Sequence, residues 1–211
     1  HITDLPFIIE IFFFFFKFSY NNALEETIEV LKKHSFNDVI WPDFTKIKLL
    51  RKDAFSLILK PIKLDEIIKI HNYSIKAIKA NHIAGACGFV IKKNHQGFVI
   101  SGDTHINPHI WEEINNDEEI KSLVIECSYP DKLQELAKLT KHLTPELIAN
   151  ELEKLTRKNL SVFYYHLKPS YNKELLKDIK KHKLLTYNGK ILKEGDVIHI
   201  ETGSIQSTVL S

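Results

Sequence analysis

Strand-like apolar runs fill the middle of this chain, and alternating helix-like and strand-like segments follow them. Between about residues 55 and 101 the sequence holds five short runs rich in Ile, Val and Phe, and the turn sequence KKNHQG separates the last two. From residue 108 onward, helix-like segments such as PHIWEEINN alternate with buried-strand sequences such as LSVFYYHLKP. This order indicates an α/β layered fold. Because no linker rich in Gly, Pro or Ser interrupts it, we expect residues 1–211 to form a single domain.

The charge balance gives no sign of a nucleic-acid or membrane partner. Lys and Arg together number 29 against 27 acidic residues, a net charge of +2. The segment LPFIIEIFFFFFKF at residues 5–18 is shorter than the roughly 20 apolar residues of a membrane-spanning helix, and Glu10 interrupts it, so we expect a buried helix. The two cysteines, Cys87 and Cys127, lie in apolar runs and are expected to be small core residues.

Three potential metal ligands follow strand-like runs at the point where each run ends. His82 follows IKAIKA, Asp103 follows GFVISG, and His166 follows LSVFYY. In layered α/β proteins such strand ends meet at one edge of the sheet, where loops build sites. Imidazole nitrogen and carboxylate oxygen suit zinc and neighbouring transition metals, and Gly102 would leave room for an ion beside Asp103. Each residue alone has an ordinary alternative, a surface or core histidine or a turn aspartate.

Several short motifs carry a resemblance that spans nearly the whole chain. They are HITDLPFII, HSFNDVIWPDF, GFVISGDT, IECSYP, KHLTPELIANEL, HLKPSY and GDVIHIE. In this order and strand context they resemble the metallo-β-lactamase fold and, within it, the class II 3′,5′-cyclic-nucleotide phosphodiesterases. The resemblance implies an α/β, metallo-β-lactamase-like αββα sandwich. It also implies that the N-terminal strands and the first metal motif, H-x-H-x-D, are missing from these 211 residues.

The resemblance assigns metal-binding roles residue by residue. His1 matches the last His that follows the H-x-H-x-D motif and would bind the second of two metal ions, while His82 would bind the first. Asp103 would bridge both ions, and His166 would complete the second site. The expected cofactors are therefore two divalent ions, with zinc as the leading candidate. Because the chain starts at His1 rather than Met and lacks H-x-H-x-D, we expect a fragment of a longer protein that by itself binds metal weakly.

The activity that the resemblance implies is hydrolysis of a cyclic nucleotide, cAMP or cGMP, to the 5′-nucleotide by a metal-activated hydroxide. His142, just before LTPELIANEL, is the expected proton donor to the leaving 3′ oxygen, and Glu126, at the end of SLVIE, would orient its ring. The alternatives are a helix-cap neighbour for His142 and a surface acid for Glu126. Trp41 and Phe44 are candidates to stack on the purine, with loop packing as the alternative.

The sequence leaves two other functions open. A tRNase-Z-like nuclease that processes RNA 3′ ends has the same fold, but the sequence shows neither its Gly-rich basic arm nor a strongly basic charge. A degenerate, non-catalytic domain would account for the missing first motif. The favoured partner is a small-molecule cyclic nucleotide, with no nucleic acid and no membrane. His105 and His109 are expected to lie on a loop and a helix face rather than to bind metal.

Overall fold

The computed structural model describes residues 5, 8–9, 19–49, 53–157, 159–186, 188–199 and 204–207. These residues belong to two compact units, His1–Lys63 and Leu64–Ser211. Each unit has a hydrophobic cluster of its own. That residues 1–211 act as a single domain stays a prediction.

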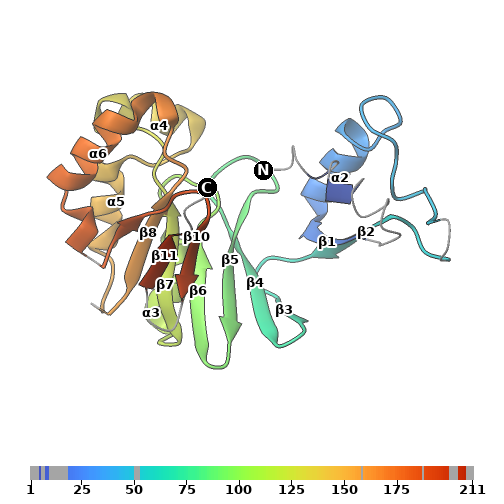
Figure 1. The fold of residues 1–211 in the computed structure, drawn as a ribbon, viewed down its shortest axis with the longest axis horizontal. Coiled ribbons are helices and arrows are strands. Elements are labelled where there is room, and N and C mark those ends of the chain that lie inside the picture. Colours follow the sequence, from blue (N-terminus) through green and yellow to red (C-terminus); the bar gives the residue numbers. More distant parts are fainter. Residues whose placement is uncertain are drawn as a thin grey trace. The chain divides into compact units, whose positions relative to one another are not determined.

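A seven-stranded sheet forms the centre of the larger unit (Figure 1). Its strands lie in the order β3-β4-β5-β6-β7-β8-β9. The pairs from β3 to β6 are antiparallel and those from β6 to β9 are parallel, because hairpins join the first group and longer crossovers join the second. The bounds are Ile67–Ile70 (β3), Tyr73–Lys79 (β4), Cys87–Lys93 (β5), Gln96–Ile100 (β6), Ile120–Glu126 (β7), Ser161–Tyr165 (β8) and Lys190–Ile191 (β9).

Helices alternate with the parallel strands, as the sequence predicts. The Thr144 hydroxyl caps α5 by accepting a bond from the Leu147 amide, with Pro145 at the first helical position. This helix ends at Leu152, whereas the sequence TPELIANELEKLTRK at residues 144–158 has a helical pattern throughout. The helices are α3 (Pro108–Asn116), α4 (Gln134–Thr140), α5 (Pro145–Leu152) and α6 (Asn172–Lys181), with short 3₁₀ helices at Asp131–Leu133 (η2), Pro169–Tyr171 (η3) and Leu184–Thr186 (η4).

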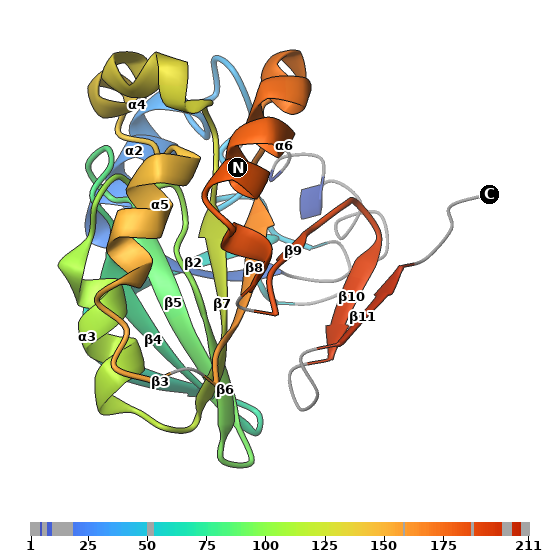
Figure 2. The same cartoon turned by 90° about the vertical axis from the view of Figure 1, so that its left-hand side faces the viewer.

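One face of this sheet packs against α3, α5 and α6 (Figures 1 and 2). Val99, Leu123 and Val162 are neighbours in the register of β6, β7 and β8, and all three are fully buried. The alternation of strand side chains directs such residues to a single face. The helices pack against these strands with apolar residues at helical spacing. These residues are Ile110 and Ile114 of α3, Ile148 and Leu152 of α5, and Leu175 and Ile179 of α6.

A two-stranded hairpin follows the seven-stranded sheet. β10 (Asp196–His199) pairs antiparallel with β11 (Ser204–Ser207). The sequence pattern predicts β10, but the polar composition of the last ten residues predicts a weakly ordered tail. Residues 204–207 of this tail form the second strand of the hairpin.

The smaller unit contains a parallel pair of strands and one helix. β1 (Ser19–Leu24) pairs with β2 (Leu57–Ile62), and α2 (Glu25–His34) lies between them in the sequence. Its buried cluster is Ile9, Leu31, Phe36, Phe44 and Leu57. Most of the helix expected at residues 5–18 lies outside the described residues. Among the residues that are described, no helix has the length and apolar character to cross a membrane.

Candidate metal centre

Four strands of the larger unit end at the same edge of its sheet, and each end carries a residue of the candidate site. β6, β7 and β8 are parallel, and β4 runs in the same direction because β4 and β6 are both antiparallel to β5. His82 follows β4, Asp103 follows β6 and His166 follows β8, while Glu126 is the last residue of β7. The shared edge therefore brings together residues that lie far apart in the sequence.

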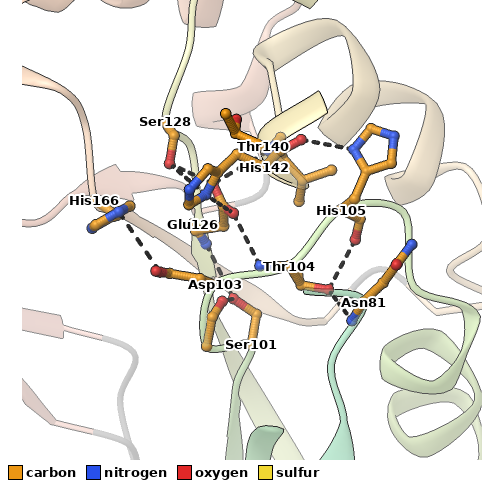
Figure 3. A network of polar contacts seen from close by, with 12 residues as sticks. Asn81, Ser101, Asp103, Thr104, His105, Glu126, Ser128, Thr140, His142 and His166 are labelled. Carbon is orange, nitrogen blue, oxygen red and sulfur yellow. Dashed lines mark hydrogen bonds and ion pairs between the residues drawn. The ribbon is translucent and has the colours of Figure 1, made fainter. Parts of the chain in front are cut away.

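These side chains and His142 form a compact polar cluster. Figure 3 shows Asp103, Glu126, His142 and His166 of this cluster. One ligand atom each from His82, Asp103 and His142 lies within 4.8 Å of the other two. His166 Nε2 is 3.7 Å from Asp103 Oδ1. The rings of His82 and His166 lie 5.0 and 5.5 Å from the His142 ring, measured between centroids. Of the expected ligands, His82, Asp103 and His166 come together, and His1 lies outside the described residues.

Gly102 places Asp103 for a backbone reason. Its φ is +62°, in the left-handed region that side chains other than glycine rarely adopt. A Cβ at this position would lie 2.6 Å from the carbonyl oxygen of Cys87 in β5. The sequence suggests that Gly102 leaves room for an ion. The structure adds that the tight turn after β6 and its close approach to β5 both need a glycine.

Glu126 is fully buried, and four donors satisfy its carboxylate. Figure 3 shows Thr104, Ser128 and His142 around it. Oε1 accepts bonds from the Thr104 amide at 3.0 Å and from His142 Nδ1 at 2.6 Å. Oε2 accepts bonds from the Ser128 hydroxyl at 2.6 Å and from the Leu143 amide at 3.3 Å. The alternative of a surface acid is therefore wrong. Such a set of partners is what a buried carboxylate needs.

Bonds on three sides hold His142 in place. Its amide donates to the Ala137 carbonyl at 2.8 Å, and its carbonyl accepts from His105 Nδ1 at 2.7 Å. Nδ1 of the ring faces Glu126, and the side chain is only 9% exposed. His105 thus lies on a loop, as predicted, and supports His142. The sequence did not indicate this role, nor the roles of Ser128 and Thr104.

The donor set fits a transition-metal ion. Burial lowers the pKa of His82, and His142 lowers it further against the opposing effect of Asp103. Burial also lowers the pKa of His166, where Asp103 opposes the shift and Lys168 adds to it. A neutral imidazole is the form that binds a metal. Nε2 of His82 is buried and has no hydrogen-bond partner among the described residues, so a cation would satisfy it.

Positive charge and aromatic rings surround the cluster. Lys168 Nζ donates to His166 Nε2 at 3.3 Å and lies 5.8 Å from the centre of the Tyr129 ring. Lys141 Nζ donates to the His82 carbonyl at 2.9 Å. The Tyr129 ring in turn is 5.8 Å from the His142 ring. Two ammonium groups beside the ligand cluster favour an anionic substrate.

The remaining candidates are His109 on α3 and two aromatic residues of the smaller unit. The side chain of His109 on α3 is 54% exposed and lies 3.5 Å from Glu112, so it occupies a helix face as predicted. Phe44 and Trp41 belong to the smaller unit. The Phe44 ring is buried and meets the Phe36 ring edge-on at 5.7 Å, and Trp41 packs against the same cluster. Core packing accounts for both side chains in this unit, and contact with a purine stays a hypothesis.

The sequence of this chain matches a known protein family. A sequence model of the class-II cAMP phosphodiesterases matches residues 22–190, about four-fifths of the chain. The chain belongs to this family. The matched range contains His82, Asp103, Glu126, His142 and His166.

Relatives of the chain are distant and longer. A probable 3′,5′-cyclic-nucleotide phosphodiesterase of Yersinia pestis is 26% identical over 180 residues, and the match covers 71% of this chain and 49% of the relative. The chain spans about half the length of the curated relatives that it matches.

Solved structures establish the fold. Unliganded yeast PDE1 superposes with a TM-score of 0.68 at 23% identity, over 84% of this chain and 59% of the yeast chain. The metallo-β-lactamase fold protein YhfI of Bacillus subtilis superposes with a TM-score of 0.61 at 14% identity, over 90% of this chain and 69% of YhfI. The α/β fold is therefore metallo-β-lactamase-like, as the motifs predict.

Proposed function

We propose that this chain carries most of the active site of an enzyme that hydrolyses 3′,5′-cyclic nucleotides to 5′-nucleotides. The observation that carries the proposal is the convergence of His82, Asp103 and His166 with the Glu126–His142 pair in a chain of the class-II cAMP phosphodiesterase family. A small cyclic phosphodiester anion is the substrate class that fits the family and the two lysines at the rim.

Metal binding is shared among residues from different strand ends. His82 and Asp103 would hold the first ion, while Asp103, His166 and His1 would hold the second, with zinc as the leading candidate. Such ions, when bound, would supply a water of lowered pKa and would neutralise charge on the phosphate. The three described ligands fit this role because two are imidazoles with lowered pKa and the third is a carboxylate that both ions can share.

His142 would deliver the proton that the leaving 3′ oxygen needs. The buried carboxylate of Glu126 lies 2.6 Å from Nδ1 and fixes the direction of the ring. Ser128 and Thr104 would act as positioning residues because they hold Glu126. Lys168 would attract the phosphate to the rim of the site.

Hydrolysis of cAMP and cGMP by the full-length protein that carries this chain tests the proposal. We expect activity that a chelator abolishes and that added Zn²⁺ or Mn²⁺ restores. Asp103→Asn should lower kcat at least about 1,000-fold, because the variant loses a charged ligand. His109→Ala, an exposed change on α3, is the matched control and should retain full activity. Hydrolysis that is insensitive to chelator, or cleavage of precursor tRNA with cyclic nucleotides untouched, would contradict the proposal.

A further inference from the structure

Asp131 is a nearly buried acid to which the proposed function gives no role. Its side chain is only 12% exposed. Its Oδ1 accepts a hydrogen bond from the Glu146 amide at 2.9 Å. Its Oδ2 lies 2.6 Å from His182 Nε2 and 3.2 Å from Lys181 Nζ. A carboxylate removed from water needs such partners, so these contacts hold Asp131 and its neighbours as one connected unit.

The partners of Asp131 come from elements that are separate in the sequence. Asp131 itself is the first residue of η2, and Glu146 lies in the first turn of α5. Lys181 is the last residue of α6, and His182 follows it. The Asp131 amide also donates to Asp178 Oδ2 of α6 at 2.9 Å. Since α5 and α6 lie side by side (Figures 1 and 2), one residue joins the segment after β7 to both helices.

The side of α6 that faces this segment is marked by a helical spacing of three or four residues. Its contacting residues are Tyr171 at the N-cap, Glu174, Asp178 and His182. The Tyr171 ring is 6.1 Å from the Tyr129 ring, and Glu174 accepts from Lys132 Nζ at 2.9 Å. The Lys132–Glu174 pair is exposed to water, and such pairs contribute little. The contacts of Asp131 are therefore the main polar link.

Each element that Asp131 joins lies next to a residue of the candidate site. In the sequence, η2 begins shortly after Glu126, α5 shortly after His142, and α6 shortly after His166. These three site residues must keep fixed positions relative to one another for the proposed reaction. A misplacement of about 1 Å can lower a rate by roughly 100-fold.

We propose that Asp131 is a positioning residue that keeps Glu126, His142 and His166 in their relative places. This inference rests on the proposed function, because it names what holds that site in shape. The bond to the Glu146 amide fixes the start of α5 beside His142. The bonds to α6 and to the residue after it fix the helix that follows His166. Asp131 acts through these segments and has no direct part in the chemistry.

The test measures hydrolysis of cAMP by the full-length protein that carries this chain. Asp131→Asn keeps the size of the side chain and an acceptor for the Glu146 amide, but loses the charge that faces His182 and Lys181. We expect kcat to fall about 10- to 100-fold with KM within about threefold, because alignment is lost rather than substrate binding. Circular dichroism checks the fold.

Two variants of His182 test the same link from α6. His182→Ala removes the donor to Asp131 Oδ2 and should lower kcat at least about fivefold. His182→Gln keeps an N–H donor and should return kcat to within about twofold of the wild type. These variants also test the inference if Asp131→Asn does not fold. Equal kcat values for folded His182→Ala and the wild type would then overturn it.

Asp117→Asn is the matched control. Asp117 also accepts a backbone amide, from Glu119 at 3.0 Å, and a lysine, Lys92 at 2.8 Å. It precedes β7, whereas Glu126 ends that strand, so its contacts lie at the opposite end of the strand from the candidate site. We expect kcat within about twofold of the wild type. An equal loss of kcat in Asp117→Asn and Asp131→Asn would mean that general destabilisation explains both, and would overturn the inference.

A second readout does not need activity. In ¹⁵N-histidine spectra of the same full-length protein, the Nδ1 proton of His142 reports its 2.6 Å contact with Glu126, and its loss in His142→Gln assigns the signal. Asp131→Asn should shift this signal, and Asp117→Asn should leave it in place. If the wild type hydrolyses no cyclic nucleotide, the proposed function fails, but this signal still tests Asp131. An unchanged signal in folded Asp131→Asn would overturn the inference even where the wild type is active.

Discussion

At the scale of single residues, the carboxylate of Glu126 organises the centre of the site. The carboxylate is fully buried. It accepts hydrogen bonds from the ring of His142 and from the Thr104 amide in the loop after β6. When a buried, charged acceptor loses a hydrogen-bond donor, the free-energy cost of removing that acceptor from water is no longer compensated. Residues that never touch a substrate are thus expected to influence both stability and the direction of the His142 ring.

Ser128→Ala should destabilise the fold by about 1.5–3 kcal/mol, the usual value of a hydrogen bond to a charged group. The hydroxyl donates to Glu126 Oε2 at 2.6 Å, and the other contact of that oxygen, from the Leu143 amide, is longer at 3.3 Å. Urea unfolding followed by circular dichroism measures the change. Ser170→Ala, at an exposed position in η3, is the control and should stay within about 0.5 kcal/mol of the wild type. Equal unfolding midpoints for the two variants would contradict this role for Ser128.

Part of the cluster could be predicted from the sequence, because its residues follow strand-like runs. His82, Asp103 and His166 each follow an apolar run, and parallel strands bring such positions to one edge. The supporting contacts were not predictable, because they join loops distant in the chain. His105 lies 37 residues from the carbonyl that it contacts, and Thr104 lies 22 residues from Glu126. No spacing or residue type marks such pairs.

At the scale of elements, segments with their own start and stop signals were predicted best. The hairpin of β5 and β6 has Asn94 and His95 at positive φ, as a tight two-residue turn requires. α5 differs because its helical sequence pattern runs past Leu152, where the helix ends. Trp111 donates to Glu151 at 2.6 Å, in the last turn of the helix, and Glu151 also pairs with Lys154. The sequence pattern beyond Leu152 continues to look helical without contributing to the helix.

Gly102→Ala should destabilise the turn after β6 by about 2 kcal/mol or more. The left-handed conformation costs a side chain about 1–2 kcal/mol, and the new Cβ would meet the Cys87 carbonyl oxygen at 2.6 Å. Gly97→Ala, in β6, is the comparison. Its φ lies outside the left-handed region, although its Cβ would lie 2.6 Å from Lys92 Cγ and 3.1 Å from the Ile91 carbonyl oxygen, so a loss smaller than that of Gly102→Ala is expected. Urea unfolding compares the two variants, and a smaller loss for Gly102→Ala than for Gly97→Ala would count against this account.

At the scale of the whole chain, the two units differ in how much core they possess. The larger unit has a cluster of 20 buried residues around β6, β7 and β8. The smaller unit has five, among the residues that are described. Stability follows buried apolar surface, so the larger unit should govern global unfolding. The polar ligands of the site lie at the rim of this stable sheet, which suits residues that must hold fixed positions.

Hydrogen exchange measured by mass spectrometry should rank the strands accordingly. In β7 six of seven residues are buried, and the strand is paired on both sides, so its amides should exchange only through global unfolding. β10 and β11 form a two-stranded sheet in which Val197 is 48% exposed, and an isolated hairpin is only marginally stable. Their amides should exchange at least about 100-fold faster than those of β7. Equal protection would mean that the hairpin is stabilised as an integral part of the larger unit's core, and that the stability of the chain reaches its C-terminal strands.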